Sequence, residues 1–569
     1  MAGTLGGFAL PNDPAHHRFT GFSPRFWALV VLTGIGAGLG AGALMKLLQV
    51  VEHLCYSYQS GMFLDGVEHA PVSRRAIVMA IAGVVTAAGV FLLKRSPGSG
   101  AGEVNERIWF HSGLISEWKT VAQAMLSVTI IGMGTSLGRE SAPKQTGAAI
   151  ASWLSRRVKL SSAESRLLVA CGTGAGMGAV YNVPLGGALF SLEVLLGTLA
   201  LPLIPPALAS SVIATVIAWT MLPDQPTYTI GDYSVTASQL IWSVGFGPVA
   251  GLASVLWIRS VVFAEGLRPK RSIAMALPVP VLGGLGLLSA FYPQLLGNGK
   301  DVVDLALSAR LGLPLLLALM ILKPLVTAAC LGSGAPGGLF TPTITFGALL
   351  GGLLGQAWSL FWPGAAPESY VVIGATAVLA ASMQSPIAAV VLLIELTRHS
   401  AVLLAPILFA VAGAAVTARR LDPRSIYSGR IHTGKRAAAT KPLGFSPAFD
   451  YRVGQGFEVI SAAASYPEVL ERFARAGGQL NCLYVLDDQA RLAGRIPVQA
   501  LANPNPLTPV LSTAAACDLM VRTEPLDARL PEAEALVRLN REPSGELPVV
   551  DPDSGELLGV VKRGSALAD

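Results

Sequence analysis

The sequence predicts an all-α membrane domain with an inverted repeat and broken, tilted helices, followed by a soluble α/β tail. Of its 569 residues, 52% are hydrophobic and only 13% are charged, whereas soluble domains carry about 25% charged residues. A membrane-spanning helix needs roughly 20 apolar residues, and several uncharged runs are long enough for one or two. A large soluble core would instead contain amphipathic helices. The runs are Phe26–Met45, Ala76–Leu93, Leu195–Pro223, Ser272–Gly299, Pro324–Pro367, Ser369–Ile394 and His399–Ala418.

These runs set the predicted domain boundaries. Residues 1–24 form a polar segment, 25–430 the membrane domain, 431–452 a linker and 453–569 the tail. Basic residues flank the apolar region at both of its ends, from Arg18 and Arg25 to Arg419, Arg420 and Arg424. By the positive-inside rule, both termini of a multi-pass protein of the cell (inner) membrane are then expected in the cytoplasm.

Charge and cysteine content exclude several other classes. The net charge of +6 is explained by topology, and we expect no nucleic-acid partner. The five cysteines are scattered without a CxxC pair, which argues against a disulfide framework or a zinc site. We also expect a protein that is not an enzyme and that holds no metal or cofactor.

The membrane domain contains an internal repeat. The stretch GTGAGMGAVYNVPLGGALFSLEVLL from Gly172 resembles GATAVLAASMQSPIAAVVLLIELTR from Gly374, which aligns Glu193 with Glu395 at an offset of 202. Near offset 200, SLGRE (136–140) aligns with PGGLF (336–340). Two homologous halves, about 25–225 and 226–430, predict an inverted repeat with the working site between them.

The tail also repeats. At an offset of 64, Leu483 in CLYVLDDQARLAGRI aligns with Leu547 in LPVVDPDSGELLGVV, and each string reads as strand, turn and strand. A helical stretch precedes each copy, YPEVLERFARAGG in the first and LPEAEALVRLNRE in the second. The tail is therefore predicted to be two tandem modules of one kind.

Clusters of glycine and proline interrupt the apolar runs, as in GSGAGE and GSGAPGGLFTP. Inside a bilayer, broken backbone is tolerated where it is buried in protein or lines a polar cavity. The N-termini of the resulting half-helices present free N–H groups and a positive dipole end, which suit an anion. The adjacent charges Arg139 and Glu140 follow one such uncharged run, and an ionisable residue at this depth suggests a functional site.

These motifs together resemble the CLC family of chloride channels and proton/chloride exchangers over roughly residues 25–430. GSGAGE (Gly98–Glu103) is similar to the family's GSGIPE, GRESA (Gly138–Ala142) to GREGP, and GLFTP (Gly338–Pro342) to GxFxP. RSIYSG (Arg424–Gly429) matches the stretch with the pathway tyrosine. The departures Ala101–Gly102 and Ser141–Ala142 lie beside the pathway, where they could alter its width or anion preference.

The resemblance implies a role for each matched residue. Ser99 and Tyr427 would form the inner constriction, and the backbone N–H groups of Leu339 and Phe340 would hold the central anion without help from a lysine or arginine. Glu140 would be the gate, with a carboxylate that mimics chloride at the outer site and swings away on protonation. Arg139 would point toward water or a structural partner.

The family contains both channels and exchangers. In its exchangers an internal glutamate often follows the Glu of F-x-x-E, and here Val194 occupies that position after Glu193. Because valine cannot carry a proton, the sequence favours a passive chloride channel with a glutamate gate, slightly ahead of a proton-coupled chloride antiporter. Some exchangers of the family lack this glutamate. An organic-anion carrier and a non-conducting membrane sensor are the remaining alternatives.

The resemblance also implies partners. The expected ligands are chloride, other small anions and protons, and the expected assembly is a homodimer in the bilayer with one pathway per subunit. The tail resembles a pair of CBS modules, regulatory appendages of this family. Its stretches RIPVQALA and VKRGSALA lack the Asp that often contacts a nucleotide ribose, so we expect structural coupling rather than nucleotide binding.

Overall fold

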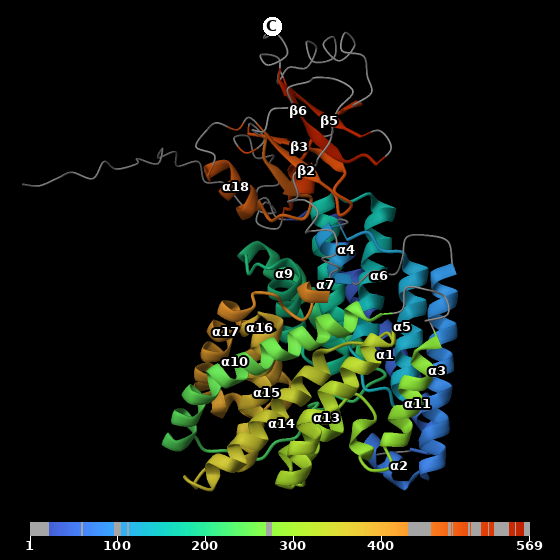
Figure 1. Ribbon diagram of the computed structural model, residues 1–569, viewed down its shortest axis with the longest axis vertical. Helices are drawn as coiled ribbons and strands as arrows, with labels where there is room; N and C mark the ends of the chain where they lie inside the picture. Colours follow the sequence, from blue (N-terminus) through green and yellow to red (C-terminus); the bar gives the residue numbers. More distant parts are fainter. Residues whose placement is uncertain are drawn as a thin grey trace, which may run out of the picture.

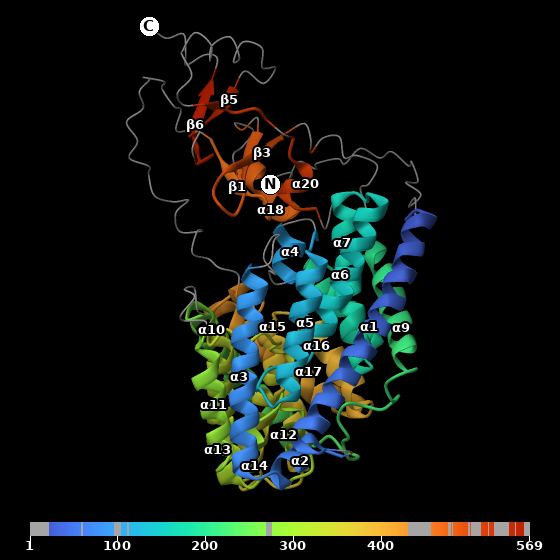
Figure 2. The same ribbon diagram turned by 90° about the vertical axis from the view of Figure 1, so that its right-hand side faces the viewer.

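The computed structural model describes residues 22–58, 61–95, 104–110, 113–268 and 276–430, and in the tail 457–475, 480, 482–498, 501, 514–521, 523–527, 546–551 and 554–562. Figures 1 and 2 show a bundle of tilted helices with the tail strands at one end and α2 at the opposite end. The all-α membrane domain and the α/β tail are thus as predicted. The second helical stretch of the tail, LPEAEALVRLNRE, lies outside the described residues.

Among the described residues, the first part of the membrane domain contains nine α-helices and two other short helical elements up to residue 218. Their bounds are α1 Pro24–Tyr56, α2 Phe63–His69, α3 Val72–Arg95, α4 Val104–Phe110, α5 Glu117–Gly132, α6 Ser141–Val158, α7 Ser162–Tyr181, α8 Pro184–Leu189, the π-helix η1 Phe190–Leu196, the 3₁₀ turn η2 Leu201–Leu203 and α9 Ile204–Ala218.

The second part begins after the loop that follows α9. Its elements are α10 Ala237–Gly266, α11 Pro278–Leu288, η4 Pro293–Leu295, α12 Lys300–Leu307, α13 Leu313–Gly332, α14 Phe340–Ser359, α15 Pro367–Met383, α16 Pro386–Thr397, η5 Ser400–Leu403, α17 Leu404–Leu421 and η6 Ser428–Arg430.

Six helical segments in the described part of the chain are long and apolar enough to cross a membrane: Pro24–Tyr56, Val72–Arg95, Leu201–Ala218, Ala237–Gly266, Leu313–Gly332 and Ser400–Leu421. The uncharged run Pro324–Pro367 does not form one span. It contains the end of α13 and all of α14, separated by a break where Gly334 adopts φ 101°. The break is buried in protein, as irregular backbone at membrane depth must be.

Close helix crossings hold the centre of the bundle together. Helices α6 and α7 cross at Gly147 and Gly172, where a Cβ on Gly147 would lie 2.0 Å from the carbonyl oxygen of Gly172. Helices α14 and α15 cross in the same way at Gly347 and Gly374, where the corresponding distance is 2.6 Å. Only glycine permits backbones to approach this closely. The two crossings stand 200 and 202 residues apart, which are the offsets of the sequence repeat.

Two glutamates cap each other's helices. Glu193 in η1 accepts hydrogen bonds from the amides of Ile387 and Ala388 at the start of α16, at 3.3 and 2.5 Å. Glu395 in α16 accepts from the amides of Leu185 and Gly186 at the start of α8, at 3.1 and 2.5 Å. A carboxylate at a helix N-terminus satisfies orphan donors and complements the dipole. Glu193 therefore has a structural role, and its neighbour Val194 is buried in the same π-helix.

The tail contains two small sheets with the same topology. In each, the first strand pairs in parallel with the second, and the second pairs antiparallel with the third. Their register is interrupted at equivalent places, between Val485 and Leu486 and between Val549 and Val550. The elements are β1 Val459–Ser461, α18 Tyr466–Arg475, β2 Cys482–Leu486, β3 Leu492–Pro497, α20 Ala516–Leu519, β4 Leu526–Asp527, β5 Glu546–Val550 and β6 Leu557–Lys562.

The tail contacts the membrane domain through a buried ion pair. Arg166, in the first turns of α7, donates from Nη1 to Asp518 of α20 at 2.5 Å, and the two side chains are only 4% and 10% exposed. The same guanidinium donates from Nε to the carbonyl of Ile108 in α4 at 2.9 Å. One arginine therefore joins α4, α7 and the tail.

Candidate anion site

The site is built where two helices begin. Gly138 and Gly338 form an isolated antiparallel bridge, with each amide donating to the other's carbonyl at 2.8 Å. These two residues align at offset 200 in the sequence repeat. The bridge brings the N-termini of α6 and α14 together, so their unpaired amides and positive dipole ends face one small volume. The motifs GRESA and GLFTP, 200 residues apart, thereby become one site.

Glu140 fills this volume. Its side chain is fully buried, at 0% exposure, and three donors surround its carboxylate. The amide of Phe340 donates to Oε1 at 2.7 Å, while the hydroxyls of Tyr181 and Thr341 donate to Oε2 at 3.2 and 3.3 Å. The two hydroxyl oxygens lie 2.6 Å apart. The geometry is a cage of N–H and O–H donors that suits one negative charge.

The structure brings some of the expected residues together. Phe340, the expected holder of the central anion, donates its amide directly to Glu140, and Leu339 precedes it as the N-cap of α14. The resemblance implied that the Glu140 carboxylate takes the outer site and that the Phe340 amide holds the central anion. In the structure the carboxylate accepts a hydrogen bond from that amide. Ser99 lies outside the described residues.

Tyr427 is buried and lies on the segment that follows α17. Its ring packs edge-on against Phe190, with centroids 5.8 Å apart. The segment is fixed by Arg424, which donates two hydrogen bonds to Asp422 at 2.8 and 2.6 Å and lowers the pKa of that carboxyl to about 2. The amide of Ile426 also donates to the carbonyl of Ser382 at 2.9 Å. The tyrosine is thus held rigidly against the membrane helices.

Lys144 lies one helical turn beyond Glu140 on α6 and is 9% exposed. Its ammonium nitrogen lies 5.0 Å from the ring centroid of Phe190 and 5.2 Å from that of Tyr427. The motifs predicted a central anion held without a lysine or arginine. The structure places a lysine against the ring of the expected pathway tyrosine.

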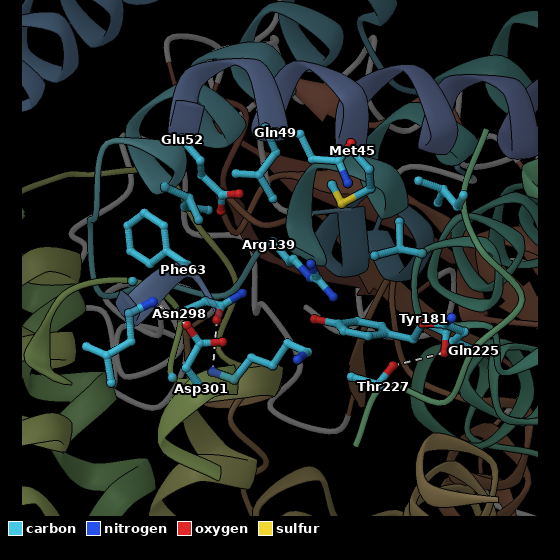
Figure 3. A pocket seen from close by; sticks show the side chains of 18 of the residues that line it. Met45, Gln49, Glu52, Phe63, Arg139, Tyr181, Gln225, Thr227, Asn298 and Asp301 are labelled. Atoms are coloured by element: carbon cyan, nitrogen blue, oxygen red, sulfur yellow. Dashed lines mark hydrogen bonds between the residues drawn. The ribbon is translucent and has the colours of Figure 1, made fainter. Parts of the chain in front are cut away.

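A cavity of about 340 Å³ is lined by Arg139, Tyr181 and residues of α1, α2 and α12. Helices α2 and α12 lie at the end of the bundle opposite the tail (Figure 2). Figure 3 shows Arg139 and Tyr181 side by side in it, with Glu52 of α1 and Asp301 of α12 on its wall. The guanidinium carbon of Arg139 lies 5.4 Å from the centroid of the Tyr181 ring. Tyr181 therefore lies between this cavity and the buried carboxylate of Glu140. Arg139 adds a positive charge to the wall of the cavity.

Sequence reasoning missed three residues of the site. Thr341 lies inside the quoted GLFTP motif, and a hydroxyl next to an anion-holding amide was the available signal. Tyr181 lies in the repeat at the end of α7, but nothing local connects it with Glu140. Lys144 could have been found from its spacing, since a residue four positions after Glu140 lies on the same helix face.

The fold and the site define a multi-pass membrane protein with paired helix N-termini around a buried carboxylate. The sequence model described as Voltage gated chloride channel matches residues 79–419, more than half of the chain. The chain therefore belongs to the voltage-gated chloride channel (CLC) family, as the motifs predicted.

Particular relatives agree with this membership. The voltage-gated ClC-type chloride channel ClcB of Salmonella typhimurium is 31% identical over 412 residues, covering 70% of this chain and 97% of the relative. A solved slow cyanobacterial Cl⁻/H⁺ antiporter matches with a TM-score of 0.64 at 21% identity, over 74% of this chain and 100% of the other. A CLC-type fluoride/proton antiporter matches with a TM-score of 0.58 at 18% identity, over 71% and 97%.

Proposed function

We propose that this protein exchanges chloride for protons across the membrane, with one pathway per subunit. The observation that carries the proposal is the 2.7 Å hydrogen bond from the Phe340 amide to Glu140 Oε1. The amide expected to hold the central anion can serve either the carboxylate or chloride, so the two compete. Two solved proteins that share the fold are antiporters by description, which favours exchange over the passive channel that the sequence placed slightly ahead.

The competition links proton binding to chloride binding. When a proton binds Glu140, the carboxyl group loses its charge. It then binds the positive helix ends more weakly, because charge-assisted hydrogen bonds are roughly twice as strong as neutral ones. The amide of Phe340 then donates its hydrogen bond to chloride, and the protonated side chain moves toward the cavity beyond Tyr181. Release of the proton to that cavity returns the carboxylate to its donors and expels the anion.

The cytoplasmic proton route does not use Val194. This residue is buried and apolar, so protons must reach Glu140 through water or another side chain. The absence of a carboxylate at this position is the reason to expect slow coupling, and it is the main argument for the channel alternative.

The exchange proposal is tested by driving chloride with protons. Purified protein in liposomes should accumulate labelled chloride against its concentration gradient when a pH gradient alone is imposed with the membrane potential clamped to zero. Liposomes without protein provide the control. Chloride that only equilibrates under these conditions would contradict exchange and favour the channel.

Tyr427 is expected to strengthen anion binding at the inner end of the pathway. Tyr427→Ala removes both the hydroxyl and the ring that packs on Phe190, and we expect chloride affinity to fall roughly tenfold, as for loss of one hydrogen bond to a charged group. Tyr427→Phe separates the hydroxyl from the ring. Titration calorimetry with chloride measures the affinity, and equal affinities in the parent and both variants would contradict this role.

We propose that the tail is a CBS-like regulatory pair docked on α7. Asp518→Asn should loosen this docking, because the change leaves Arg166 buried without its charged partner at a cost of about 3 kcal/mol. Asp518 also caps α20 by accepting from the Ala515 amide at 2.9 Å. An asparagine can still accept that hydrogen bond. Faster hydrogen exchange in 514–521 and altered transport rate are expected. Glu458→Gln breaks the exposed pair with Arg472 and should change neither; identical exchange in both variants would contradict docking.

Orientation follows from charge. Arg156, Arg157 and Lys159 end α6 at the side where the next helix contacts the tail through Arg166, and the positive-inside rule places that side in the cytoplasm. We propose that both termini are cytoplasmic in the inner membrane. Protease digestion of intact spheroplasts and of inverted membrane vesicles tests this orientation. Cleavage of the tail in intact spheroplasts would contradict it.

We also propose a homodimer, as family membership implies. Helices α8, α9, α16 and α17 expose apolar side chains that two copies could bury, among them Leu185, Val216, Ile387, Leu408 and Phe409. The mass of the purified protein in detergent tests the assembly, and the mass of a single chain would contradict it.

A further inference from the structure

We propose that Lys144 is a specificity-determining residue that gives the inner half of the pathway a fixed positive charge and makes an anion subsite with Tyr427. The inference rests on the proposed function in that it assumes an anion pathway past Tyr427. It starts from position: Lys144 is on the same helix face as Glu140 and its ammonium lies 5.2 Å from the Tyr427 ring centroid.

A cation in the first turn of α6 opposes the helix macrodipole. Glu140, the N-cap four residues earlier on the same face, turns its carboxylate to the Phe340 amide and the Tyr181 hydroxyl. Burial adds to this, since a desolvated ammonium is unfavourable. The ring faces of Phe190 and Tyr427 offset part of that cost through cation–π contacts. They also hold the ammonium beside the tyrosine rather than in bulk water.

A buried cation strengthens the binding of any anion that comes near it, whatever else it contacts. At about 6 Å and an effective dielectric constant of about 20, one unit charge attracts another strongly enough to change affinity roughly ten- to a hundredfold. The ligand class is a small monovalent anion, such as a halide or nitrate. The lysine thus sets a tighter inner site than hydroxyls and amides alone would give, and a slower release toward the cytoplasm.

The test is chloride titration calorimetry on the purified full-length protein. Lys144→Met keeps the side-chain volume and removes the charge, and it should raise the chloride Kd roughly ten- to a hundredfold. Lys144→Arg keeps the charge and should leave the chloride Kd within about threefold of the parent's. Lys159→Met removes the same charge from the exposed cytoplasmic end of α6 and should leave the Kd unchanged.

A Kd for Lys144→Met within about threefold of the parent's would overturn the proposal. So would equal losses in Lys144→Met and Lys144→Arg, because a packing role rather than charge would then explain both. Lys144→Gln is the second variant if the methionine protein fails to fold, with the same expected loss. Proton coupling is measured separately in liposomes: a parent that binds chloride but moves no protons contradicts exchange, while the calorimetric constants alone decide the role of Lys144.

Discussion

Glu140→Gln is expected to abolish proton movement while chloride still crosses the membrane, at a rate that no longer depends on pH. Glutamine has the shape of the buried carboxylate and can still accept the Phe340 amide, but it carries no charge and binds no proton. The variant therefore separates the two halves of the exchange. Proton flux and chloride flux are measured in the same liposomes, with a pH electrode and a chloride electrode.

The matched control is Glu52→Gln, which replaces a carboxyl group on the wall of the cavity beyond Tyr181 without touching the donors around Glu140. We expect it to keep proton coupling, with at most a change in rate. Glu140→Ala should resemble Glu140→Gln in its pH independence, since both lack the titrating group. If Glu140→Gln moves protons as the parent does, Glu140 is not the group that couples the two ions.

Gly338→Ala is expected to expel the Glu140 carboxylate from its donors and to abolish coupled exchange. A Cβ on Gly338 would lie 1.8 Å from Glu140 Oε1 and 2.4 Å from its carboxyl carbon, so the two groups cannot coexist. All three nearest atoms belong to the Glu140 side chain, which is flexible and can move away. The backbone bridge to Gly138 does not have to break, and the protein should still fold.

A double variant makes this prediction sharp. With Glu140→Ala the clashing carboxylate is absent, so adding Gly338→Ala should change the melting temperature and the chloride flux much less than it does in the parent. The interaction energy from this cycle should be large, of the order of 1–3 kcal/mol, as for residues in direct contact. Additive effects of the two substitutions on stability would mean that the carboxylate does not occupy the position beside Gly338.

The sequence predicted best those features that depend on a short local motif. The strands of the tail follow from turn chemistry in Asp-Pro-Asp-Ser-Gly and its counterpart, and β5 and β6 flank that turn. Glu140 and Phe340 were identified through the resemblance of GRESA and GLFTP to CLC motifs, and in the structure they lie at the N-termini of α6 and α14. The sequence repeat aligns Gly138 with Gly338 at offset 200, and in the structure these two glycines form a backbone bridge.

The remaining features depend on contacts that no local pattern encodes. Tyr181 meets Thr341 across 160 residues of chain, and Arg166 meets Asp518 across 352. The π-helical turn at Phe190–Leu196, which orients Phe190 toward Tyr427, has an ordinary apolar sequence. Lys144 was visible in the sequence, but its meaning depends on the ring it faces, and that ring comes from the far end of the membrane domain.

The central claim is that chloride and protons move in exchange, and one measurement tests it most directly. Purified protein is reconstituted in liposomes, a chloride gradient is imposed with no pH difference, and the external pH is recorded. The account predicts that chloride flow drives protons in the opposite direction and so creates a pH difference, and that Glu140→Gln stops this proton movement. Chloride flux with no coupled proton movement would contradict it and would make the protein a passive channel.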